Sequence, residues 1–138
     1  MITRGELQYL AQLRLDDARL LLKDSRASSA YYLAGHAVEL GLKACMSKLI
    51  RPDSLPDKAF MAVIESHQLE DLRAAAGLRL ELNAEIRHQP QLGAYWAIVS
   101  NWSESSRYHV WDAATAANLV QAVGDKSHGV LQWLKKHW

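Results

Sequence analysis

The chain has 138 residues, of which 49% are hydrophobic and 22% are charged, and its formal net charge is +1. This length and composition predict a single soluble domain spanning residues 1–138. A net charge so close to zero argues against a protein that binds duplex DNA, because such proteins need a strongly basic surface.

Charged residues interrupt the first 22 positions, and no stretch of the chain reaches the ~18 apolar residues that a membrane span needs. We therefore expect neither a signal peptide nor contact with a membrane. The single cysteine, Cys45, excludes an intrachain disulfide and fits a cytoplasmic location. Because apolar residues surround it at helical spacing, a buried thiol is favoured over a reactive one.

Apolar residues recur at helical spacing along most of the chain, and no segment alternates as a strand would. Thr3 and Asp112 are placed to cap the first and last helices, and Ser25 or Ser28 to cap the second. The prediction is an all-α fold, a four- to five-helix up-and-down bundle. The predicted helices span residues 3–24, 28–49, 58–65, 66–77, 80–88, 91–102 and 113–136, and Gly124 and Gly129 could mark a kink in the last.

The second predicted helix is apolar on most of its sides, which is typical of a central helix packed by several neighbours. Its one narrow polar line includes His36, Glu39 and Lys43, which lie three and four residues apart and so touch on one face. This line is either a surface ion pair or the wall of a groove or an interface. A metal site is not expected, because the Glu-x-x-His order of carboxylate bundles is reversed and has no second copy.

Two further segments carry chemically versatile side chains. His67 precedes a short helix, where it either has a structural role, as a cap or a loop contact, or acts as a catalytic base. Arg107, Tyr108 and His109 lie in an aromatic-rich stretch that ends at Trp111. An arginine binds phosphate in a bidentate manner and an aromatic ring stacks on a base, so this stretch is either an anchored loop or a nucleotide site.

Three stretches together resemble the HEPN family, the helical bundles of nucleotide-binding and RNA-processing systems. The first runs from Ala30 to Ala44 and contains Glu39 and Lys43 in the family's Glu-x-x-x-Lys-Ala pattern, preceded by an aromatic and small residues. The second, His67-Gln68-Leu69, is similar to the family's His-x-Leu turn. The third, Arg107-Tyr108, is similar to the Arg-Tyr pair that precedes its last helix.

The resemblance implies a homodimeric four- or five-helix bundle that needs no cofactor. Members of the family often act beside a minimal nucleotidyltransferase as a toxin–antitoxin pair, or in RNA-directed defence. Active members are metal-independent ribonucleases in which four to six residues separate an arginine from a following histidine. No arginine of this chain has a histidine at that distance, and Arg107 and His109 are too close together.

The leading hypothesis is therefore a non-catalytic, dimerising HEPN-like module that binds a nucleotide, RNA or a nucleotidyltransferase. Its expected ligand-binding residues are Arg107, Tyr108, Trp111, Lys43, Glu39 and His36, with the polar line of the second helix facing Arg107. One alternative is an endoribonuclease with a rearranged site that uses Arg107 with His109 or His67. Another is a purely structural dimerisation subunit.

Overall fold

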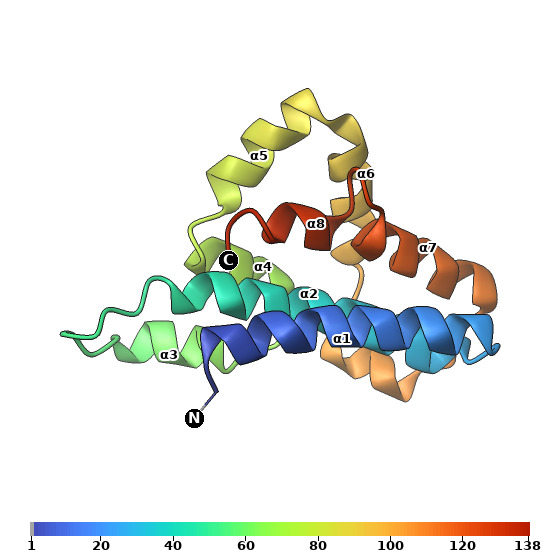
Figure 1. The fold of residues 1–138 in the computed structure, drawn as a ribbon, viewed down its shortest axis with the longest axis horizontal. Coiled ribbons are helices and arrows are strands. Elements are labelled where there is room, and N and C mark those ends of the chain that lie inside the picture. Colours follow the sequence, from blue (N-terminus) through green and yellow to red (C-terminus); the bar gives the residue numbers. More distant parts are fainter. Residues whose placement is uncertain (1) are drawn as a thin grey trace.

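The structure, a computed structural model, describes residues 2–138, so that Met1 alone of the predicted domain lies outside the described residues. Residues 2–138 form helices and no strand, which confirms the all-α prediction (Figure 1). The elements are α1 (Arg4–Lys23), α2 (Ala27–Ser47), α3 (Lys58–Ile64), α4 (Leu69–Ala75), α5 (Arg79–His88), α6 (Pro90–Val99), the 3-10 helix η1 (Glu104–Tyr108), α7 (Ala113–Gly124) and α8 (Val130–Leu134).

Helix α2 is the centre of the bundle, as its sequence predicted. It runs antiparallel to α1, and α4, α7, α8 and η1 also pack against it (Figure 1). Alanine and glycine let these neighbours approach closely: Ala30, Ala34, Ala37 and Ala44 are all fully buried. An element surrounded in this way is held rigidly, so polar groups on α2 have fixed positions relative to η1 and α4.

The predicted caps are correct at two helix starts and wrong at the third. Thr3 and Glu6 form a complete capping box on α1, and the Asp112 carboxylate accepts a hydrogen bond from the Thr115 N–H on α7. No side chain caps α2, contrary to the prediction of Ser25 or Ser28. Ser25 takes a positive φ of 62° in the turn, and the Ser28 hydroxyl instead accepts a hydrogen bond from the backbone N–H of Trp111.

The predicted helix 113–136 is two helices, because the chain breaks after Gly124 and resumes as α8 at Val130, and the kink allowed for at Gly124 and Gly129 is a full interruption. At the break, Arg19 of α1 donates a hydrogen bond to the Gly124 carbonyl at 2.8 Å. The turn also brings the chain back onto itself at Gly129, where a Cβ would lie 2.5 Å from the carbonyl oxygen of Asp125. Glycine is the residue that tolerates such an approach.

Helices α5 and α6 form an arm on the α7–α8 side of the bundle (Figure 1). The predicted break between them is confirmed, since Pro90 occupies the first turn of α6, where its missing N–H has no consequence. Leu92, Trp96 and Val99 are the buried residues of α6. Across residues 2–138, no helix combines the length and the apolarity required to cross a bilayer.

Candidate functional site

A buried carboxylate lies at the centre of the polar line on α2. The Glu39 side chain is only 2% exposed and accepts a hydrogen bond from Lys43 at 2.9 Å. Its Oε1 also lies 2.8 Å from Nδ1 of His67, and its Oε2 lies 3.6 Å from Nδ1 of His36. Glu39 therefore has three basic partners, two from its own helix and one from the loop before α4.

These partners keep Glu39 ionised. Burial by itself raises the pKa of this carboxyl, but the contacts with His36, Lys43 and His67, together with the positive charge of Lys43, outweigh it and hold the pKa at about 2. A buried carboxylate that remains charged at neutral pH fixes the orientation of the groups that donate to it.

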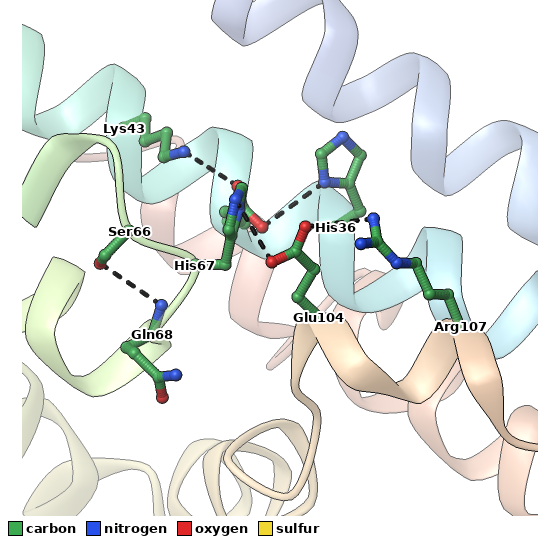
Figure 2. Close-up of polar contacts among 8 residues, drawn as sticks. His36, Lys43, Ser66, His67, Gln68, Glu104 and Arg107 are labelled. Atoms are coloured by element: carbon green, nitrogen blue, oxygen red, sulfur yellow. Dashed lines mark hydrogen bonds and ion pairs between the residues drawn. The ribbon is translucent and has the colours of Figure 1, made fainter.

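His67 connects α2 to the segment that carries Arg107. It lies in the α3–α4 loop, where the Gln68 N–H donates to the Ser66 hydroxyl, and the packing of α4 on α2 brings it over Glu39. Its Nδ1 faces Glu39, and its Nε2 lies 3.3 Å from Oε2 of Glu104 (Figure 2). Both ring nitrogens thus face carboxylates, and only the imidazolium form donates to both.

Glu104 extends this chain of contacts to Arg107. Its second oxygen, Oε1, lies 3.2 Å from a guanidinium nitrogen of Arg107, one turn along η1. The Arg107 guanidinium is also 4.9 Å from the centre of the Tyr108 ring, which is a cation–π distance. Hydrogen bonding to Tyr108 raises the pKa of Arg107 above its ordinary value, so the guanidinium is charged at every accessible pH.

We call this connected set the polar cluster; its members are His36, Lys43, Glu39, His67, Glu104 and Arg107. Figure 2 shows its labelled members converging from α2, from the loop before α4 and from η1. Exposure rises along it: the Glu39 side chain is 2% exposed, whereas that of His67 is 40% and that of Arg107 is 45%. The polar cluster is thus buried at Glu39 and faces solvent at Arg107.

Aromatic side chains hold the solvent-facing end in place. Trp102, just before η1, packs so closely on α2 that a Cβ at Gly35 would lie 2.2 Å from its ring. Trp111, just after η1, stacks on Tyr31 with ring centres 4.0 Å apart, and its indole N–H donates to the Ser106 carbonyl. With both ends anchored on α2, η1 presents Arg107 and Tyr108 to solvent as a short rigid platform.

A surface pocket of about 360 Å³ opens beside this platform. It lies between the start of α2 and the end of α1, so hydroxyl groups and apolar side chains both contribute to its wall. This composition suits a ligand that has a charged group and an apolar ring. The lining residues are Leu21, Ser28, Ser29, Tyr32, Leu33 and Arg107.

The structure brings most of the predicted site residues together and separates two of them. His36, Glu39 and Lys43 are linked to Arg107 through His67 and Glu104.

Trp111 uses its ring and its N–H in packing. His109 lies edge-on to Trp111 at 6.0 Å, with no contact to the polar cluster. The suggestion that His67 caps the next helix is wrong, because Gln68 is the N-cap residue of α4 and no side chain caps that helix.

Sequence reasoning missed Glu104 as a site residue. Its spacing of three residues from Arg107 was a usable signal, because residues so spaced touch in a helical turn. Its contact with His67 had no such signal, since that contact joins segments far apart in the chain.

Cys45 is buried, and burial raises the pKa of its thiol to about 11, which leaves it unreactive at neutral pH. Within residues 2–138, no three or more histidine, cysteine, aspartate or glutamate side chains are grouped so that they could hold a metal ion.

Comparison with known proteins does not assign the chain to a family. Neither the models of protein families, nor the curated proteins, nor the solved structures contain a match to it.

Proposed function

We propose that this chain is a HEPN-like helical module that dimerises and binds a phosphate-bearing ligand, single-stranded RNA or a nucleotide, at Arg107 without cleaving it. The observation that carries the proposal is the platform on η1. The half-exposed guanidinium of Arg107 lies next to the exposed ring of Tyr108 and lines a pocket of about 360 Å³. The sequence motifs that resemble the HEPN family lie on this platform and on the helix beneath it.

The chemistry of the platform suits a nucleotide. The guanidinium of Arg107 is 45% exposed and has nitrogens beyond the one that faces Glu104, which suits it to donate to phosphate oxygens. The ring of Tyr108, at 75% exposure, offers a face on which a base stacks. Such stacking tolerates any base, so we expect the module to prefer single strands without strong sequence preference.

The rest of the polar cluster has a supporting role in this proposal. Lys43 and His36 hold the Glu39 carboxylate, and Glu39 orients His67 beneath the ligand. Trp111 fixes the end of the platform and does not contact the base, because its ring already stacks on Tyr31.

Equilibrium binding of a fluorescently labelled single-stranded RNA tests the proposal. We expect Arg107→Ala to weaken binding by about 1.5 to 3 kcal/mol, the range for a charged hydrogen-bond donor. Arg51→Ala is the matched control, because Arg51 is also an exposed arginine paired with a nearby acid, Asp53. Equal binding by wild type and both variants would refute the site assignment.

The proposal includes a second subunit and a partner enzyme, both implied by the family resemblance. Light scattering should give twice the 15.5 kDa mass of one chain at micromolar concentration. Identifying the adjacent reading frame tests the partner, since a minimal nucleotidyltransferase there supports a toxin–antitoxin or defence role. A dimer that binds neither RNA nor nucleotide would instead be a purely structural subunit.

One observation favours a second candidate, a metal-independent endoribonuclease. The buried Glu39 holds Nδ1 of His67 at 2.8 Å, which is how a carboxylate orients a histidine base, and Nε2 faces Glu104, whose other oxygen contacts Arg107. In this candidate His67 moves protons and Arg107 stabilises charge on the phosphorus. RNA incubated with protein and a chelator tests it: cleavage lost in both His67→Ala and Arg107→Ala supports the enzyme, and no cleavage by wild type eliminates it.

A further inference from the structure

The carboxylate of Glu104 lies between two basic groups that belong to different segments. One oxygen is 3.3 Å from Nε2 of His67, and the other is 3.2 Å from the Arg107 guanidinium. Both distances exceed the ~2.7–2.9 Å of a strong charge-assisted hydrogen bond. The Glu104 side chain is 31% exposed and is therefore not locked in place by packing.

The two basic groups have different supports, and neither needs Glu104 to keep its position. His67 is held from below by Glu39 at 2.8 Å, and Arg107 lies over the ring of Tyr108. Removal of the Glu104 carboxylate would leave the His67 imidazole and the Arg107 guanidinium without the acceptor that they share. That arrangement is an anion-binding site, and in this structure a carboxylate from the chain itself occupies it.

We infer that Glu104 is the resident occupant of an anion site made by His67 and Arg107, and that a terminal phosphate displaces it. The inference rests on the proposed function and names its ligand class, a phosphate monoester such as a nucleotide or a phosphorylated RNA end. A monoester has three acceptor oxygens and a charge of about −1.5 to −2, so it contacts both His67 and Arg107 and outcompetes a single carboxylate. A phosphodiester inside an RNA strand, with one charge, displaces Glu104 less readily.

Charge supports this choice of ligand. The charges of Lys43, Glu39, Glu104 and Arg107 sum to zero. If Glu104 moves out, the three remaining charges sum to +1, which a phosphate group compensates. Glu104 thereby neutralises the site when no ligand is bound, and an anion displaces it only if it binds more strongly than one carboxylate.

The test is a titration of the full chain with inorganic phosphate at constant ionic strength, followed by nuclear magnetic resonance at the His67 ring and the Arg107 side chain. We expect Glu104→Gln to bind phosphate about fivefold more tightly than wild type. That is the change expected from removing one unit charge about 4 Å from the ligand in a water-like medium. Glu81→Gln is the matched control, because it removes the same charge from the exposed face of α5, and it should leave the affinity unchanged.

The outcomes separate this inference from the proposed function. Tighter phosphate binding by Glu104→Gln, with both reporter groups responding, supports displacement even if no RNA or nucleotide binds. Equal or weaker binding by Glu104→Gln than by wild type overturns it, even where RNA binds at Arg107. The inference is also overturned if phosphate shifts the His67 resonances of Glu104→Gln and shifts them equally in the Glu104→Gln, Arg107→Ala double variant. In that case the phosphate would bind away from Arg107.

Discussion

Replacing Glu39 by glutamine should destabilise the protein at neutral pH and remove part of its sensitivity to acid. Glu39 is 2% exposed and contacts Lys43 and His67 at 2.9 and 2.8 Å. A neutral amide keeps the shape of the side chain, but it removes the charge that compensates these basic groups. Breaking a buried ion pair in this way typically costs about 3 to 5 kcal/mol.

The pKa of Glu39 gives the pH range of the effect. The pKa is about 2 in the folded protein and 4.5 in an unperturbed glutamate. Because folding lowers the pKa, the stabilisation is complete above about pH 5 and is lost as the pH falls from about 4.5 towards 2. A difference of roughly 2.5 pKa units corresponds to on the order of 3 kcal/mol.

Urea unfolding followed by circular dichroism measures this contribution. The difference in unfolding free energy between wild type and Glu39→Gln should shrink by on the order of 3 kcal/mol between about pH 5 and pH 2. Glu81→Gln, a change of the same kind at a side chain that is 60% exposed, should differ little from wild type at any pH. If the difference in unfolding free energy between wild type and Glu39→Gln stays constant with pH, the low pKa assigned to Glu39 is refuted.

Three further predictions concern packing, ligand contact and reactivity. Gly35→Ala should lower the unfolding free energy by at least about 2 kcal/mol, because the new Cβ would lie 2.2 Å from the buried Trp102 ring. Gly5→Ala is the control: nothing lies within 4 Å of its Cβ, so the unfolding free energy should change by less than about 0.5 kcal/mol. Equal effects of the two would contradict the packing. Tyr108→Ala should weaken RNA binding by about 1 kcal/mol or more and leave the melting temperature unchanged, since the ring is 75% exposed. Binding as tight as in wild type would remove Tyr108 from the site. Cys45 should react with a thiol reagent only when urea unfolds the chain, because burial raises its pKa to about 11, and fast reaction of the folded protein would show an open thiol.

The fold was predictable where local rules decide it. Helical periodicity predicted the central position of α2, and the cap positions Thr3 and Asp112 were readable from their own neighbours in sequence. The break between α7 and α8 lies at the two glycines that indicated a kink, Gly124 and Gly129. The hydrogen bond from Arg19 to the Gly124 carbonyl at this break was not predictable, because it joins residues 105 positions apart in the chain.

The candidate site also combines features that local sequence predicts with contacts that it does not predict. The polar line on α2 and the Arg-Tyr pair on η1 were found from spacing and residue type. Their connection was not, because His67 and Glu104 contact each other only after the α3–α4 loop and η1 have packed on α2. A pattern within one segment gave no information on which histidine would meet the buried Glu39.

The salt dependence of RNA binding tests most directly the central claim that Arg107 contacts a phosphate. For a single strand, each phosphate neutralised contributes about 0.7 to the slope of log affinity against log salt concentration. We expect Arg107→Ala to reduce this slope by about that amount, while Arg51→Ala leaves it as in wild type. An unchanged slope and affinity in Arg107→Ala would contradict the account.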